Sequence, residues 1–373
     1  MNNKIARNMK AIISGGGTGG HIFPALAIAN AIKERYADAD ILFIGAIGKM
    51  EMEKVPNAGY KIEGLPIVGL QRKLTIKNLV VPFKLIKSQL KAKKIIKTFN
   101  PDIVIGVGGY ASAPTLKMAT KLGYPTILQE QNSYPGLTNR MLANNAAKIC
   151  VAYQGLDKFF PQEKIVFTGN PVRKSIENIM ISKQESANYF KLDLNKKVVL
   201  SVGGSLGART INESILENIA YFKNNDIHLI WQTGKVFYEK AKNAVEEAKA
   251  ENIRVFDFIS EMDKAYTAAD CIISRAGAIA ISELCLVGKP IILIPSPNVA
   301  EDHQTKNAMA LVDKGAAAIV YDKDAKTTLI PALDDLINNS DKQRSMSLAC
   351  SSMGVRDAAY KIVDEVEKVI GIK

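Results

Sequence analysis

Short apolar runs alternate with longer amphipathic segments along nearly the whole chain. Runs that are apolar at successive positions are typical of strands covered by helices on both faces. The alternation of strand and helix therefore predicts an α/β fold built on parallel, doubly wound sheets. The expected strands are residues 10–14, 40–45, 102–108, 125–130, 148–153 and 164–169, followed by 197–203, 227–234, 253–259, 270–277, 290–296 and 315–321.

One pattern occurs twice. The segment AIISGGGTGGH begins at Ala11 and VVLSVGGSLGA begins at Val198, and each reads as a strand, a glycine loop and the start of a helix. A length of 373 residues also suits two domains better than one. We expect a Rossmann-like domain at 1–172, a second at 173–355, and a C-terminal helix at 356–373 that packs back on the first domain.

Charge divides the chain at the same boundary. Residues 1–172 hold 23 Lys and Arg against 10 Asp and Glu, whereas residues 173–373 hold 26 against 27. The excess in the first half indicates an anionic partner: a membrane, a nucleic acid or a phosphorylated ligand. No apolar run is long enough to span a membrane, and glycines interrupt the apolar stretch after the basic N-terminus. The four cysteines lack metal-ligand spacing, which favours buried thiols in a reducing compartment.

Three glycine loops follow expected strands, at 15–20, 106–109 and 203–207. The first fits G-x-G-x-x-G between a strand and a helix, where backbone N–H groups and the helix dipole suit a phosphate. A dinucleotide site would also need an acidic residue at the end of the second strand, and that strand ends in Gly45-Ala46-Ile47-Gly48. The loops predict a cleft between domains lined with phosphate-binding backbone; the alternative is that the glycines only permit tight turns.

Seven motifs in order give the chain a family resemblance. They are GGGTGGHIFPALA, GVGGYASAP, LQEQNSYPGLTNR, GNPVR, GGSLGAR, SRAGAIAISEL and PSPNVAEDHQTKNA. Together they resemble the MurG family of bacterial peptidoglycan N-acetylglucosaminyltransferases, in glycosyltransferase family 28. The resemblance implies a GT-B fold, no cofactor, and inverting transfer of N-acetylglucosamine (GlcNAc) from UDP-GlcNAc. The acceptor would be the 4-hydroxyl of MurNAc in undecaprenyl-pyrophosphoryl-MurNAc-pentapeptide (lipid I), and the product lipid II for peptidoglycan.

The same resemblance implies roles for individual residues. In the second domain, Arg173 and Ser205 would face the diphosphate, the Ile259 backbone would touch uracil, and Glu283 would bind ribose. The remaining donor contacts would be Arg275, Ala278, Ile279 and Ala280, with Gln304 and Asn307 on the GlcNAc hydroxyls, and Thr18, Gly19, Gly20 and Asn132 from the first domain. Gly16, Gly17, Gly108, Gly109 and Tyr110 would hold the acceptor pyrophosphate. Leu206 and Ala280 depart from the family pattern, and each removes a side-chain contact near the donor.

Two residues compete for the role of general base. Glycosyl transfer needs a group that removes the acceptor proton. His21 closes the first glycine loop, where it would act as base or as a ligand of acceptor phosphate, unless it only orders the loop. Glu130, at the end of a strand, is the rival base, unless its carboxylate ties down the following loop. His228 and His303 are expected to be structural.

A metal ion is not expected. Two Asp-x-Asp sequences occur, at Asp38–Asp40 and Asp322–Asp324, and both are interpreted as solvated turns. Helix N-termini together with Arg173 can instead stabilise the departing diphosphate.

A basic, partly apolar segment extends from residue 65 to 101 and contains no acidic residue. Its nine basic residues are Arg72, Lys73, Lys77, Lys84, Lys87, Lys91, Lys93, Lys94 and Lys97. Interleaved apolar residues favour contact with the anionic inner leaflet of the cytoplasmic membrane over nucleic acid, because few aromatic residues are available for stacking. A solvated helix is the remaining alternative. We expect a peripheral enzyme on the cytoplasmic face, with cell-wall synthesis proteins as further candidate partners.

Other functions remain open at this point. A GT-B protein with these features could transfer another UDP-sugar to a lipid, epimerise UDP-GlcNAc, or act as a membrane-associated nucleotide-binding module without catalysis. The basic, apolar segment argues against an epimerase, because the substrate of an epimerase is soluble.

Overall fold

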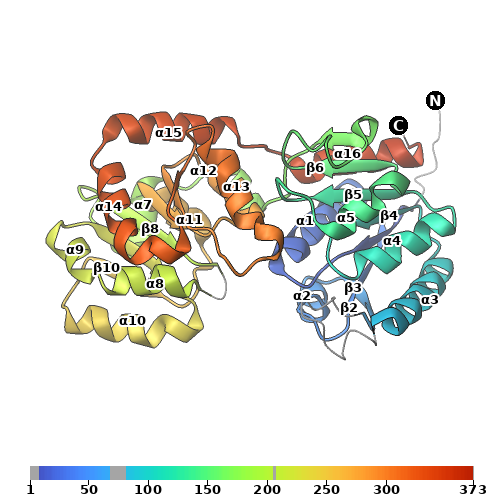
Figure 1. Cartoon of the computed structure of the whole chain (residues 1–373), viewed down its shortest axis with the longest axis horizontal. Coiled ribbons are helices and arrows are strands. Elements are labelled where there is room, and N and C mark those ends of the chain that lie inside the picture. Colours follow the sequence, from blue (N-terminus) through green and yellow to red (C-terminus); the bar gives the residue numbers. More distant parts are fainter. Residues whose placement is uncertain (1–7, 68–80, 205–206, 373) are drawn as a thin grey trace. The chain divides into compact units, whose positions relative to one another are not determined.

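The apolar runs form two parallel β-sheets, one in each half of the chain (Figure 1). The structure, a computed structural model, describes residues 8–67, 81–204 and 207–372. Its contacts divide the chain into unit 1, residues 1–172 with 357–373, and unit 2, residues 173–356. The two-sheet α/β architecture predicted from the alternation of strands and helices is confirmed.

Unit 1 contains a seven-stranded parallel sheet in the order β3-β2-β1-β4-β5-β6-β7. Its strands are β1 (Lys10–Ser14), β2 (Asp40–Ala46), β3 (Lys61–Leu65), β4 (Ile103–Gly106), β5 (Thr126–Glu130), β6 (Lys148–Val151) and β7 (Ile165–Phe167). The order reverses between β1 and β4, and in open α/β sheets ligands bind outside the carboxyl ends of the strands at this point. The first and second glycine loops follow β1 and β4.

Helices cover both faces of this sheet. They are α1 (Gly19–Arg35), α2 (Glu51–Asn57), α3 (Val81–Phe99), α4 (Ser112–Lys121), α5 (Leu137–Leu142) and α16 (Ala358–Ile370), with 3₁₀ turns η2 (Ala143–Asn145) and η3 (Gln162–Lys164). Ile13 packs with residues of α1 and α16 on one face, and Ile12 packs with residues of α3 and α4 on the other. Neighbouring strand residues therefore enter different cores, which explains why the strands are apolar at successive positions.

The last helix of the chain belongs to unit 1. In Figure 1, α16 is red but lies among the blue and green elements of that unit. Its Ile362, Val363 and Val366 are buried against α1, and Arg35 at the end of α1 donates to Glu367 at 2.9 Å. The chain thus passes from unit 1 to unit 2 and back again.

Unit 2 contains a six-stranded parallel sheet in the order β10-β9-β8-β11-β12-β13. Its strands are β8 (Val198–Val202), β9 (His228–Gln232), β10 (Ile253–Phe256), β11 (Cys271–Ser274), β12 (Ile291–Leu293) and β13 (Ala318–Ile319). The helices are α6 (Lys174–Glu177), α7 (Lys183–Phe190), α8 (Arg209–Leu216), α9 (Ile219–Asn224), α10 (Lys235–Glu247), α11 (Met262–Ala268), α12 (Ala278–Val287), α13 (His303–Val312), α14 (Ala325–Ile337) and α15 (Ser340–Ser352), with 3₁₀ turns η4 (Ala300–Asp302) and η5 (Asp322–Asp324). Trp231 of β9 is fully buried in the core shared with α8, α10 and α14.

All twelve expected strands are present, and the described part of the chain contains one further strand that the sequence did not predict. The missed strand is β3, which pairs with β2 at the edge of the unit 1 sheet. Its Lys61 and Glu63 are exposed while Gly64 and Leu65 are buried. An edge strand with charged residues lacks the continuous apolarity on which the other predictions depended.

Candidate functional site

His21 lies at the carboxyl end of β1, in the first turn of α1. Its Nδ1 is 3.1 Å from the carbonyl oxygen of Gly16 and 3.3 Å from Oγ1 of Thr18. A carbonyl oxygen only accepts hydrogen bonds, so the contact with Gly16 places the ring proton on Nδ1. The imidazole then presents Nε2 as its basic nitrogen, and a neutral histidine of this tautomer is suited to accept a proton.

The two glycine loops of unit 1 pack directly against each other. A Cβ added to Gly108 would lie 2.9 Å from Nε2 of His21, and one added to Gly109 would overlap the Gly16 carbonyl oxygen. Both glycines also have positive φ, at 92° and 86°. These positions require glycine because two backbones and a ring meet there, which goes beyond the tight turn considered from the sequence.

A buried carboxylate lies beneath the first loop. Glu51, at the start of α2, is 1% exposed and accepts from Gly17 N at 2.8 Å and from Ala46 N at 3.0 Å. The Gly17 N–H is therefore occupied in this structure, and a contact of Gly17 with acceptor pyrophosphate stays a prediction. Sequence reasoning missed Glu51, because an acidic residue in the first turn of a helix is ordinary.

Glu130 anchors its own loop. Oε1 accepts from the backbone N and side-chain Nδ2 of Asn132, at 3.0 and 3.1 Å, and Oε2 accepts from Gly136 N and Asn139 Nδ2, at 3.1 and 2.8 Å. Burial raises the pKa of Glu130, while these hydrogen bonds oppose the rise. With four donors on a buried carboxylate, the geometry supports the loop-tying alternative rather than the rival base. It also holds the Asn132 amide that was expected to contact the donor.

The remaining expected residues of unit 1 are accessible. Thr18, Gly20 and Tyr110 are exposed and Gly19 is half-buried. Thr18 is the N-cap of α1 and makes no side-chain cap hydrogen bond, and the first turn of this helix has no acidic residue. Their contacts with substrate stay predictions.

In unit 2 the start of α12 is open. Its N-cap is Gly277, no side chain caps the helix, and its first turn lacks an acidic residue. Among the residues that the structure describes, nothing lies within 4 Å of a Cβ built on Gly277. The first N–H groups of a helix have no intrahelical partner and carry partial positive charge, so Ala278, Ile279 and Ala280 present backbone donors suited to an anion.

Two expected donor ligands, one of them on α12, pair with each other. Arg173 donates from Nε and Nη2 to the two carboxylate oxygens of Glu283, both at 2.7 Å. Tyr266, which is buried, donates its hydroxyl to Glu283 at 3.3 Å. Side-chain exposure is 44% for Arg173 but 5% for Glu283. Burial opposes the charge of Arg173, but its bonds and attraction to Glu283 dominate and raise its pKa.

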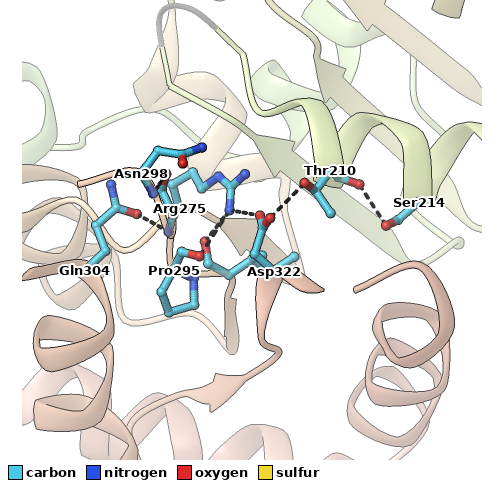
Figure 2. A network of polar contacts seen from close by, with 9 residues as sticks. Thr210, Ser214, Arg275, Pro295, Asn298, Gln304 and Asp322 are labelled. Atoms are coloured by element: carbon cyan, nitrogen blue, oxygen red, sulfur yellow. Dashed lines mark hydrogen bonds and ion pairs between the residues drawn. The ribbon is translucent and has the colours of Figure 1, made fainter. Parts of the chain in front are cut away.

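Arg275 is the centre of a structural network (Figure 2). Its Nη1 donates to the carbonyl oxygens of Ile294 and Pro295, at 3.1 and 3.3 Å, and to Asp322. Asp322 also accepts from Thr210 Oγ1 of α8 at 2.9 Å. The interpretation of Asp322 as a solvated turn residue was wrong: its carboxylate ties η5 to α8 and to Arg275, which follows β11. Arg275 therefore supports the loops around the expected donor site in this structure.

Gln232, at the end of β9, joins two parts of the expected nucleotide site. Its Nε2 donates to the Gly204 carbonyl at 3.2 Å, and its Oε1 accepts from Ile259 N at 2.9 Å. The Ile259 N–H is thus occupied, which leaves its carbonyl for the expected uracil contact. The predicted diphosphate ligand Ser205 and the neighbouring Leu206 lie outside the described residues.

The expected sugar ligands lie on α13. Gln304 accepts at Oε1 from Ser296 N, at 2.8 Å, and so fixes the turn after β12 (Figure 2). Asn307 is 1% exposed. Gln304 therefore has a positioning contact of its own, and Asn307 would need a local rearrangement to touch a sugar hydroxyl.

Within residues 8–67, 81–204 and 207–372, no three His, Cys, Asp or Glu side chains gather as metal ligands would. In the same ranges, no helix has the length and apolarity needed to cross a membrane. The four cysteines are buried and free, as expected.

Comparison with known proteins shows which family shares this architecture. Residues 11–151 match the glycosyltransferase family 28 N-terminal domain, and residues 198–362 match the C-terminal domain of that family. A protein of Phocaeicola vulgatus is 54% identical over 97% of this chain and 96% of its own length. One of Parabacteroides distasonis is 53% identical over 98% and 100%. Both are named UDP-N-acetylglucosamine--N-acetylmuramyl-(pentapeptide) pyrophosphoryl-undecaprenol N-acetylglucosamine transferase.

Solved structures agree with this placement. The crystal structure of Acinetobacter baumannii MurG superposes with a TM-score of 0.80 at 28% identity, covering 96% of this chain and 99% of that one. A UDP-GlcNAc 2-epimerase from Neisseria meningitidis, solved with UDP-GlcNAc, gives 0.66 at 16% identity over 96% and 100%, which shows a shared fold alone.

Proposed function

The chain belongs to glycosyltransferase family 28, and from this premise we propose how its two units perform GlcNAc transfer. It is an N-acetylglucosaminyltransferase whose donor is UDP-GlcNAc and whose acceptor is the lipid-linked MurNAc-pentapeptide, lipid I. The product is lipid II, with the new bond at the MurNAc 4-hydroxyl. The observation that carries this conclusion is 54% identity to a transferase of that name over 97% of the chain.

Unit 2 binds the donor. The bare start of α12 supplies N–H groups for the diphosphate, and Arg173 adds a positive charge beside it. Glu283 is suited to accept from ribose hydroxyls while it orients Arg173. Backbone donors and a fixed arginine are already in place, so they stabilise the charge that develops on UDP without reorganising.

His21 of unit 1 is the general base. As the MurNAc 4-oxygen bonds to the anomeric carbon, its proton passes to Nε2, and the bond from that carbon to UDP breaks with its electron pair leaving on the diphosphate. Attack on the face opposite to UDP inverts the anomeric configuration. The contact between Nδ1 and the Gly16 carbonyl supports this role, since it leaves Nε2 basic.

Helix α3 holds the enzyme on the membrane. Ser88, Ala92 and Ile96 form its buried side, whereas Phe83, Ile86 and Leu90 are 74%, 57% and 64% exposed. Exposed large apolar residues at spacings of three and four lie on one face of a helix. The lysines at 87, 93, 94 and 97 are also exposed. An apolar face among lysines suits the interface of an anionic bilayer.

The surface of α3 therefore supports a peripheral location on the cytoplasmic face, where the lipid acceptor and the soluble nucleotide sugar meet. Each lysine near an anionic surface contributes roughly 1 kcal/mol. Residues 68–80 of the basic segment lie outside the described residues, and their part in membrane contact stays a prediction.

A transfer assay tests the proposed function directly. The protein is incubated with radiolabelled UDP-GlcNAc and a lipid I analogue, and the products are separated by chromatography. We expect label in a disaccharide lipid in equal amount to the UDP released. Label that stays in a nucleotide sugar of altered configuration would indicate an epimerase, and binding without turnover would indicate a nucleotide-binding module; either result rejects the proposal.

A further inference from the structure

Glu51 is a fully buried carboxylate that the chemistry above does not use. Its two oxygens take different backbone donors: Oε1 accepts from Ala46 N at the end of β2, and Oε2 accepts from Gly17 N in the first glycine loop. A buried charge is costly unless hydrogen bonds satisfy it. Here the carboxylate joins the carboxyl end of β2 to the first glycine loop.

The loop is clamped between Glu51 and the second glycine loop. Gly16 has φ of 147°, and a Cβ built there would overlap the Glu51 carboxylate. On the other side, a Cβ on Gly109 would overlap the Gly16 carbonyl oxygen. The peptide groups of Gly16 and Gly17 are thus held from both sides in a backbone conformation that favours glycine.

The clamped carbonyl is the one that contacts His21. Because Gly16 O lies 3.1 Å from Nδ1, the orientation of this peptide decides whether the ring keeps its proton on Nδ1. We propose that Glu51 is a positioning residue: by holding Gly17 N–H it aims the Gly16 carbonyl at His21 and fixes the tautomer that leaves Nε2 basic. This inference rests on the proposed role of His21 as base.

Glu51→Gln is the decisive variant. Glutamine has one acceptor oxygen, so it cannot serve both Ala46 N and Gly17 N, while its size is nearly unchanged. We expect kcat to fall on the order of 10-fold or more, as small misplacements of reacting groups do, with KM for UDP-GlcNAc changed less than twofold. Glu53→Gln is the matched control, because Glu53 lies on the same helix with 70% of its side chain exposed.

A spectroscopic readout separates positioning from simple loss of structure. The chain has three histidines, so long-range ¹H–¹⁵N spectra at a pH well above the ordinary imidazole pKa of ~6.5 resolve each tautomer. In the wild type we expect the His21 proton on Nδ1. In Glu51→Gln it should redistribute toward Nε2, with His228 and His303 unchanged.

The outcomes discriminate between the two proposals. An unchanged His21 tautomer in a folded Glu51→Gln protein overturns the positioning role, whatever happens to activity. A shifted tautomer with normal kcat upholds the structural link but removes His21 as base, which contradicts the proposed mechanism instead. Glu51→Asp, which keeps the charge but is one methylene shorter, guards against misfolding; if both variants unfold, Glu51 serves stability and the inference fails.

Discussion

Helices α1 and α12 begin in similar ways but present different chemistry. Each follows a strand end and a glycine, and neither has an acidic residue in its first turn. Before α1, however, the loop is packed against a second glycine loop, and the Gly17 N–H is occupied by Glu51. Before α12, no described residue comes within 4 Å of a Cβ built on Gly277, and no described side chain caps the helix.

The two helix starts therefore suit different tasks. The start of α1 presents a base, and the start of α12 receives an anion. A carboxylate beneath the α1 loop opposes a phosphate at Gly17 but rigidly holds the backbone that orients His21. The bare start of α12 favours negative charge, and Arg173 is held by Glu283 of the same helix. Two helix starts that each follow a parallel strand can therefore divide the work of one reaction between proton removal and charge stabilisation.

Replacing the imidazole gives the largest expected effect. His21→Ala should lower kcat by about two orders of magnitude or more, as loss of a general base does, while affinity for UDP is unchanged. Steady-state transfer assays and UDP titration calorimetry measure the two quantities. His228→Gln is the control: His228 accepts from Asp193 N at 3.0 Å, so this variant should lower Tm rather than kcat. Normal turnover in His21→Ala would show that the start of α1 does not present the general base.

Removing the charge of Glu283 should lower the affinity for UDP rather than kcat. Glu283→Gln loses both the expected ribose acceptor and the partner that orients Arg173. Hydrogen bonds to charged groups are worth about 1.5–3 kcal/mol, so UDP affinity should fall about 10- to 100-fold. Calorimetric titration measures the loss, and Glu246→Gln, with 65% of its side chain exposed, is the matched control. Unchanged affinity would reject the ribose assignment.

Much of the fold could be predicted because it depends on patterns local to the sequence. Buried parallel strands must be apolar at successive positions, and twelve such runs were visible. Strand β3 was missed because an edge strand can keep exposed charges such as Lys61 and Glu63. The individual contacts that hold α16 in unit 1, such as Arg35 with Glu367, join residues far apart in the sequence, and no local pattern specifies them.

The site was harder to predict than the fold. The position of His21 after the first glycine loop was enough to identify it as a candidate. The functions of Glu51, Gln232 and Asp322 are invisible in sequence, because each carboxylate or amide acts on backbone or side-chain groups brought near only by the sheet. The pairing of Arg173 with Glu283, 110 positions apart, is of the same kind.

The charge difference between the two units gives a smaller, graded effect. Residues 1–172 are strongly basic and residues 173–373 are nearly neutral. Lys87→Gln and Lys94→Gln in α3 should each weaken binding to anionic vesicles about fivefold, corresponding to ~1 kcal/mol per lysine. Cosedimentation with phosphatidylglycerol vesicles measures this. Lys242→Gln on α10 of unit 2 is the control, and an equal loss for that variant would contradict a membrane surface confined to unit 1.

Chelation should have the smallest effect. If the N–H groups at the start of α12 and the Arg173 guanidinium receive the charge of departing UDP, no divalent cation is needed for turnover. The sequence Asp322-Lys323-Asp324 is poorly suited to hold one, because Asp322 is already bonded to Arg275 and Thr210. We expect kcat with excess EDTA to stay within about twofold of its untreated value, since chelation removes no group assigned to the reaction. Activity that vanishes with EDTA and returns only on adding Mg²⁺ or Mn²⁺ would show that the open start of α12 does not suffice to receive the charge of departing UDP. The task assigned to the start of α12 would then be wrong.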